Sequence, residues 1–181
     1  MSVKRLKVVG VMGSGSNEHA DLAEPLGKLI ASLNAHLLTG GGSGVMTSVS
    51  RAFSKSDRVG LTIGVLPCKK NKPRSPKHGY PNQWIEVPIA THLDGGQDGH
   101  DLRSRNHINI LSCDAVVALP GGAGTSSEVS LAVQYGCKVL AYLGASGTIP
   151  SLPAEVSIAR SRDAVEKFLR DALKAPAVQS D

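Results

Sequence analysis

Two side chains of opposite charge, Arg105 and Glu128, stand near glycine-rich sequence where they could act on a phosphorylated ligand. Glu128 follows the run Pro120–Thr125 (PGGAGT), whose glycines can adopt positive φ and let a ligand approach the backbone. A glycine loop that leads into a helix N-terminus suits phosphate, because free N–H groups point outward and the helix dipole favours an anion. The carboxylate of Glu128 could then transfer protons beside that phosphate or bind a ribose hydroxyl.

A purely structural role would also explain Glu128. Thr125 is a favourable N-cap residue, and a Glu three positions after an N-cap Thr can complete a capping box by accepting the Thr N–H. On a helix, Glu128 would share a face with Leu131, Ala132 and Tyr135, which directs it inward or along a cleft. The sequence leaves both interpretations open.

Arg105 lies in a predicted helix over Leu102–Ser112, on a face that it shares with Ile108 and Asn109. An arginine on a partly apolar face needs an anionic partner, because an unpaired buried charge is costly. We expect that partner to be Glu128, a ligand phosphate or both. The alternative is an arginine whose guanidinium reaches solvent along its aliphatic stem.

Three segments, each an apolar strand followed by glycines and a helix, are expected to bring the loops together. The strand and helix of each are Leu6–Met12 with Glu18–Leu33, His36–Thr39 with Val45–Ser54, and Asp114–Leu119 with a helix that follows the N-cap Thr125. Because ligands bind beyond the carboxyl ends of parallel strands, we predict phosphate or nucleotide contacts from all three loops. The predicted contact residues are Gly13, Ser14, Gly41, Gly42, Ser43, Gly44, Gly121, Gly122, Gly124 and Thr125.

The remaining apolar runs complete an alternation of strands and helices. Further strands are expected over Leu61–Leu66, Trp84–Ile89, Lys138–Leu143 and Val156–Ala159, and a last helix over Asp163–Lys174. Asn17 and Ser161 are the expected N-caps of the first and last helices, and Pro88 indicates a sheet edge or a strand end. The pattern predicts an α/β protein with a doubly wound, mostly parallel sheet. We expect one domain over residues 1–175 and a disordered tail over 176–181.

Two polar connections allow more than one interpretation. The connection Pro67–Gln83 holds Lys69, Lys70, Lys72, Arg74 and Lys77, which form either a solvated loop or a lid whose cations meet phosphate. The loop Thr91–Asp101 contains His92, Asp94, Asp98, His100 and Asp101 in a spacing that matches no known metal loop. A glycine-rich active-site loop or a plain connection is therefore expected there rather than a metal site.

The composition excludes several classes of protein. The 181 residues carry a formal charge of +5 and only 3% aromatic residues, which favours anionic small ligands and argues against nucleic acid bound by base stacking. Three widely separated cysteines, Cys68, Cys113 and Cys137, show no zinc or redox spacing and indicate reduced thiols in the cytoplasm. No apolar stretch is long enough for a signal peptide or a membrane span.

The run Pro120–Glu128 (PGGAGTSSE) resembles the PGGxGTxxE signature of the LOG (Lonely Guy) superfamily, and Gly40–Met46 resembles its GGGxxGLM loop. The similarity extends from Gly13 to about Leu143. It implies a Rossmann-like fold, a homodimer, and a catalytic pair formed by Arg105 and Glu128. The implied reaction is that of a phosphoribohydrolase: hydrolysis of the N-glycosidic bond of a nucleoside 5′-monophosphate to free base and ribose 5-phosphate, with no cofactor required. Lysine decarboxylation, an older label in this superfamily, is not expected, because no lysine has a setting suited to pyridoxal phosphate.

The second motif of the superfamily, MxxRK, falls on residues 102–106, where Arg105 is retained. Leu102 replaces its methionine and Asn106 replaces its lysine. This departure resembles the branch that includes molybdenum cofactor carrier proteins. The alternative function is therefore a binding protein without turnover, which carries a phosphate-bearing ligand such as molybdenum cofactor. The sequence does not identify the base or the ligand.

Overall fold

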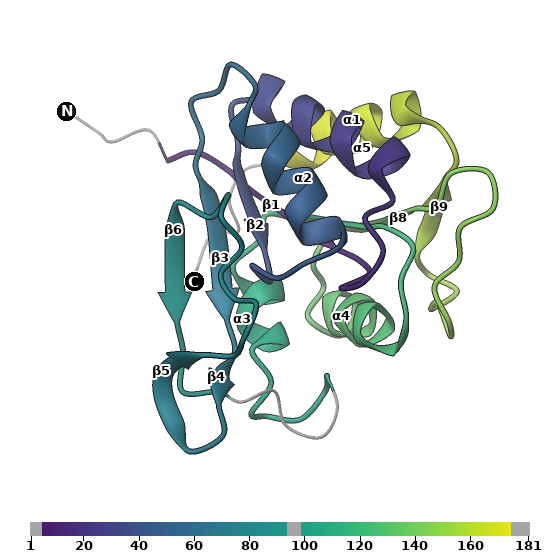
Figure 1. The fold of residues 1–181 in the computed structure, drawn as a ribbon. Helices are drawn as coiled ribbons and strands as arrows, with labels where there is room; N and C mark the ends of the chain where they lie inside the picture. Colours follow the sequence, from purple (N-terminus) through teal and green to yellow (C-terminus); the bar gives the residue numbers. More distant parts are fainter. Residues whose placement is uncertain (1–4, 94–98, 175–181) are drawn as a thin grey trace, which may run out of the picture.

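The computed structural model describes residues 5–93 and 99–174, and it is built on a seven-stranded sheet (Figure 1). The strands are β1 (Val8–Met12), β2 (His36–Thr39), β3 (Thr62–Leu66), β6 (Val87–Ala90), β7 (Ala115–Ala118), β8 (Val139–Tyr142) and β9 (Ser157–Ala159). Their order is β6-β3-β2-β1-β7-β8-β9, and every neighbouring pair is parallel. The predicted doubly wound α/β domain is confirmed.

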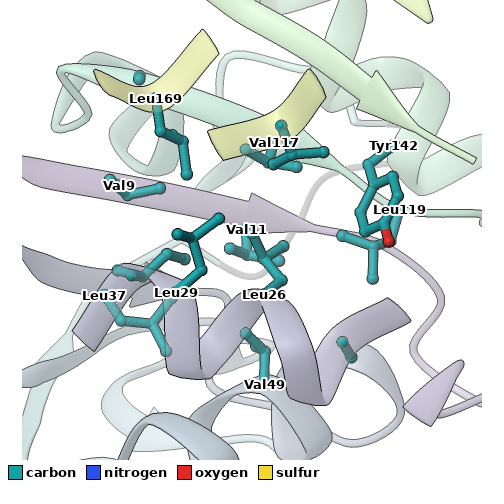
Figure 2. Close-up of a cluster of buried hydrophobic side chains, with 14 of the residues drawn as sticks. Val9, Val11, Leu26, Leu29, Leu37, Val49, Val117, Leu119, Tyr142 and Leu169 are labelled. Atoms are coloured by element: carbon teal, nitrogen blue, oxygen red, sulfur yellow. The ribbon is translucent and has the colours of Figure 1, made fainter. Parts of the chain in front are cut away.

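Five helices cover the two faces of this sheet in the described part of the chain (Figure 1). One face carries α1 (Ala20–Ser32), α2 (Val45–Ser54) and α5 (Arg162–Lys174), and the other carries α3 (Asn106–Leu111) and α4 (Ala123–Gln134). Side chains alternate along each strand, so β1 sends Val9 and Val11 to the first face and Met12 to the second. Figure 2 shows the first of these cores, in which Leu26 and Leu29 of α1 and Leu169 of α5 pack with Val9 and Val11 of β1.

The strand order reverses at β1, which pairs with β2 on one side and β7 on the other. The chain leaves both β1 and β7 at the same end of the sheet. There the N–H of Ser14 donates to the oxygen of Pro120 at 3.1 Å, and the N–H of Leu119 donates to that of Met12 at 2.8 Å. The loops after β1 and β7 are therefore joined, at the point in such sheets where ligands bind.

Several predicted boundaries need correction. The helix predicted over Leu102–Ser112 is only α3, because the N–H groups of Arg103 and Ser104 turn back to Asp101 and leave the first residues outside the helix. Asn17 is not the N-cap of α1: the cap position is His19, at φ 40°, and Asn17 Oδ1 accepts its N–H. The final helix begins at Arg162, and Ser161 Oγ accepts the Ala164 N–H at 3.4 Å, as an N-cap would.

The long connection after β3 is more regular than expected. It contains a two-stranded antiparallel hairpin, β4 (Cys68–Lys69) and β5 (Lys72–Pro76), which carries four of the five basic residues, and Lys77 directly follows it. The strand predicted over Trp84–Ile89 is shortened to β6, which lies at the sheet edge as Pro88 indicated. The predicted tail lies outside the described residues. No described helix combines the length and the apolar character that crossing a membrane requires.

Candidate functional site

A pocket of about 490 Å³ lies at the point where the strand order reverses. Its walls are the turn after β1, Gly40 after β2, Met46 of α2, the start of α3 and the first turn and a half of α4. The structure brings together seven of the predicted site residues here: Gly13, Ser14, Arg105, Gly122, Gly124, Thr125 and Glu128. Gly15, Ser16 and Asn106 also line the pocket, although the sequence analysis assigned them no contact.

The N-terminus of α4 forms one wall. The helix begins at Ala123, with Gly122 at the cap position and no hydrogen bond from a capping side chain. Thr125 therefore lies inside the first turn, so its predicted role as N-cap, and with it the capping box, is wrong. The N–H groups of Ala123, Gly124 and Thr125 precede the first residue that can bond within the helix. They offer an anion site, and in the part of the chain that the structure describes no capping side chain bonds to them.

The glycines of this loop have different roles. Gly121 is needed for packing, because a Cβ there would collide with Thr125 Oγ1, and its N–H already donates to Thr148 O at 3.2 Å. A Cβ at Gly122 or Gly124 would meet nothing within 4 Å. Both residues line the pocket, so the space beside them is open to a ligand.

Most of the loop after β2, in contrast, lies outside the pocket. Gly41, Gly42, Ser43 and Gly44 do not line the pocket. The N–H of Gly41 donates to Thr39 Oγ1 at 3.0 Å, that of Gly42 to the sulfur of Met46 at 3.4 Å, and Ser43 Oγ donates to Gly15 O at 2.6 Å. Gly44, at φ 65°, packs against the backbone of Ser14. Ser43 and Gly44 thus support the turn after β1 from behind, whereas Gly41 and Gly42 accept hydrogen bonds from Asn82.

Two backbone carbonyls and an aromatic ring hold the guanidinium of Arg105 in place. Its Nη1 donates to Gly40 O at 2.8 Å and to Val65 O at 2.6 Å, and its Cζ lies 5.5 Å from the ring centroid of Tyr80. A Cβ at Gly40 would collide with the guanidinium, so this position must be glycine for Arg105 to reach both carbonyls. Among the described residues Arg105 forms no ion pair, and its charge faces the pocket.

Glu128 has a partner that the sequence analysis did not identify. Its Oε1 accepts a hydrogen bond of 3.4 Å from Nδ2 of Asn109, which is fully buried in α3. Burial raises the pKa of Glu128 to about 7, while the charge of Arg105 and the bond from Asn109 oppose that rise. A carboxyl group with such a pKa can both take up and release a proton near neutral pH.

The contacts of Gly40, Tyr80 and Asn109 with the predicted pair were missed. For Asn109 the sequence did offer a signal, because Asn109 shares a face of the predicted helix with Arg105. Gly40 stands at the start of a run of glycines and gave no separate signal. Tyr80 lies in the basic connection, where nothing in the sequence points to Arg105.

A metal site is not apparent in residues 5–93 and 99–174, where no group of three His, Cys, Asp or Glu side chains is placed to hold an ion. Asp94 and Asp98 of the polar loop lie outside the described residues.

The fold agrees with comparisons to known proteins. Residues 6–169 match the model of the SLOG cluster4 family. The chain is 30% identical over 122 residues to a cytokinin riboside 5′-monophosphate phosphoribohydrolase from Rhodococcoides fascians, which covers 66% of this chain and 54% of the hydrolase. The chain therefore spans about half the length of that relative.

Two solved structures are similar over nearly the whole chain. A molybdenum cofactor binding protein from the phototrophic bacterium Rippkaea orientalis is 31% identical with a TM-score of 0.72, covering 93% of this chain and 98% of that one. The molybdenum cofactor carrier protein from Chlamydomonas reinhardtii is also 31% identical, with a TM-score of 0.72 and coverages of 94% and 100%.

Proposed function

Because the chain belongs to the SLOG cluster4 family, we propose that it hydrolyses the N-glycosidic bond of a nucleoside 5′-monophosphate to free base and ribose 5-phosphate. The family membership confirms the resemblance to the LOG superfamily, near the branch of the molybdenum cofactor carriers. One observation carries the proposal: Glu128, a carboxyl with a pKa of about 7, shares a pocket with the uncapped N-terminus of α4.

The 5′-phosphate binds at the start of α4. The N–H groups of Ala123, Gly124 and Thr125 donate to its oxygens, and the helix dipole adds to the attraction. The open space beside Gly122 and Gly124 admits the phosphate without displacing a side chain. The fixed charge of Arg105 faces the same pocket and offsets the negative charge of the ligand.

Glu128 lies one helical turn beyond this phosphate site, so it faces the ribose in the proposed complex. The bond from the ribose C1′ to the base nitrogen breaks, and its electron pair leaves with the base. The ionised carboxylate of Glu128 stabilises the positive charge that develops on the sugar. It also accepts a proton from the water whose oxygen bonds to C1′, and the released base takes up a proton. These steps require no cofactor.

Carriage of a phosphate-bearing ligand without turnover is the second candidate. It is favoured by the similarity of nearly the whole chain to two proteins named for molybdenum cofactor, and by Asn106 in place of the lysine of the superfamily motif. The same α4 N-terminus would bind the phosphate of the cargo, and the 490 Å³ pocket would hold its body. Glu128 would then be a binding group.

A homodimer and a cytoplasmic location complete the proposal. Large apolar side chains are exposed in and beside α3 and at the end of α4, where a second copy could cover them: Leu102, Leu111 and Tyr135.

The test is incubation of the purified protein with AMP and a panel of other nucleoside monophosphates, followed by chromatography of the free base. Glu128→Gln is the test variant, and Glu155→Gln, at an exposed carboxylate outside the pocket, is the matched control. We expect base release by the wild type and the control and none by Glu128→Gln. No release from any nucleotide, with molybdenum or a pterin chromophore found in the anaerobically purified protein, would instead favour the carrier.

A further inference from the structure

A second hollow, of about 430 Å³, adjoins the pocket on the side of the β4–β5 hairpin. Arg105, Asn106 and Gly124 line both spaces, so the two are continuous around the start of α4. The other walls of this hairpin-side hollow include Lys77 and Tyr80, which follow β5. Figure 1 shows the hairpin extending beyond the carboxyl end of β3. The hollow is therefore placed to receive a part of the ligand that lies beyond the first phosphate.

The hairpin concentrates positive charge beside this hollow. Residues 68–80 contain five of the chain's 20 Lys and Arg residues and no Asp or Glu, so the other 15 basic residues equal the 15 acidic ones. All five cations are exposed: Lys69, Lys70, Lys72 and Arg74 in the hairpin and Lys77 directly after it. In the part of the chain that the structure describes, none of them forms an ion pair. The whole net charge of the protein thus resides in one segment that borders the site.

Polar groups inside the hollow suit an anion as well. Arg105 lines both the hollow and the pocket, and within residues 5–93 and 99–174 its guanidinium donates hydrogen bonds through Nη1 alone, to the two backbone carbonyls. Ser104 and Ser127 also line the hollow; Ser104 Oγ accepts the Asn106 N–H at 3.2 Å, which leaves its O–H to donate, whereas Ser127 Oγ donates to Ala123 O at 3.0 Å. Lys77, which is exposed, supplies a second cation at the end of a flexible side chain.

We infer that the hairpin-side hollow binds a second phosphate group, so that the preferred ligand is a nucleoside 5′-diphosphate or a compound linked through such a diphosphate. This inference rests on the proposed function in placing the first phosphate at the start of α4. Because Gly124 borders both spaces, the second phosphate lies next to the first, which a 5′-diphosphate satisfies and a phosphate at the far side of the ribose does not. Lys77 and Arg105 contact it, and the four cations of the hairpin attract the anion from solution.

Isothermal titration calorimetry with AMP, ADP and adenosine 3′,5′-bisphosphate tests the inference, with Glu128→Gln in every protein to prevent turnover. We expect ADP to bind about tenfold more tightly than AMP, and the bisphosphate to resemble AMP. Lys77→Ala should reduce the ratio of ADP to AMP affinity to near one. Lys70→Ala, which removes a hairpin cation that does not line the hollow, should leave most of that ratio. The ratio should also fall as salt is raised.

Equal affinities for AMP and ADP in the parent protein would overturn the inference, as would a preference for the 3′,5′-bisphosphate over ADP. If Lys77→Ala and Lys70→Ala reduced the ratio of ADP to AMP affinity equally, the second phosphate would not bind in the hairpin-side hollow. These outcomes are separate from the fate of the proposed hydrolysis. Base release from AMP without a preference for ADP contradicts only the second phosphate site, whereas a preference for ADP without base release contradicts only the hydrolysis.

Discussion

The side-chain nitrogen Nδ2 of Asn109 donates to Oε1 of Glu128 at 3.4 Å, and the amide oxygen of the same Asn109 is buried without a partner among the described residues. An unpartnered buried oxygen is costly, and native proteins rarely leave one. When Glu128 takes up a proton, its O–H can donate to that oxygen after rotation of the amide. Asn109 can therefore serve both the ionised and the protonated form of Glu128.

We predict that Asn109→Leu raises the pKa of Glu128 further, by about half a unit to one unit. The hydrogen bond to the ionised carboxylate is stronger than the one to the neutral acid, so its loss penalises the charged form more. The pKa can be followed by NMR of the ¹³C-labelled carboxyl group. Two other charged or titratable groups face Glu128, namely Arg105 and Cys113, and both stay in place in this variant. An unchanged or lower pKa would show that the bond to Asn109 has no effect.

The raised pKa of Glu128 also predicts how stability changes with pH. The folded protein holds this proton up to a pKa of about 7, whereas the unfolded chain releases it near the ordinary value of 4.5. Stability is therefore highest below the unfolded pKa and falls as pH rises through 7, by up to about 3 kcal/mol from this group. Glu128→Gln carries no charge, so its urea-unfolding free energy should lack this fall between about pH 5 and pH 8.

Comparison of the two proteins is the control for other titrating groups. Hydrogen bonds and Arg58 lower the pKa of Glu86, and hydrogen bonds and Lys7 lower the pKa of Asp114. Both groups contribute the same pH dependence of stability to the two proteins. Parallel stability curves for the wild type and Glu128→Gln would contradict the assignment.

The sequence was enough to predict the sheet, the glycine loops and the central pair, because each depends on local pattern. His36–Thr39 and Val45–Ser54 match their predicted bounds; a glycine directly follows the strand and another directly precedes the helix. The partners of Arg105 could not be predicted in this way. Gly40 and Val65 lie 65 and 40 residues from it in the chain, and they bind it through backbone oxygens that carry no sequence signal.

The errors at α4 have a physical reason too. Thr125 followed by Glu128 matches a capping box, but the N-cap of α4 is Gly122, three residues before Thr125. The helix can begin there without a side-chain cap because Gly121 is fixed by its bond to Thr148 and by contact with Thr125. Tertiary contacts thus override a local capping preference, and they leave the helix N–H groups exposed to the pocket.

The contact between Gly40 and Arg105 can be measured by a double-mutant cycle. Gly40→Ala places a methyl group against the guanidinium, so it should destabilise the protein by about 1 to 3 kcal/mol. In the background Arg105→Ala the obstacle is absent, and the same substitution should cost at least about 0.5 kcal/mol less. Urea unfolding of the four proteins provides the measurement. Additive effects would mean that Arg105 does not occupy the space beside Gly40.

The two ends of α4 offer a matched pair of glycine substitutions that separate binding from folding. At each of Gly124 and Gly136 a Cβ would meet nothing within 4 Å. Gly124 is helical and lines the pocket. Gly136 lies just beyond the helix C-terminus and has φ 65°. Gly124→Ala should leave the melting temperature equal or higher, because Ala suits a helix better than Gly by up to about 1 kcal/mol. It should weaken AMP binding about tenfold or more, because the methyl group enters the phosphate site.

Gly136→Ala should do the reverse. It should lower stability by about 1 kcal/mol through backbone strain and leave the AMP affinity unchanged, because Gly136 is at the other end of the helix from the pocket. Thermal unfolding and calorimetric titration with AMP measure both quantities on the same samples. If Gly124→Ala bound AMP as tightly as the wild type, the anion would not lie at the start of α4, and the charge of Arg105 would be the remaining site for the phosphate.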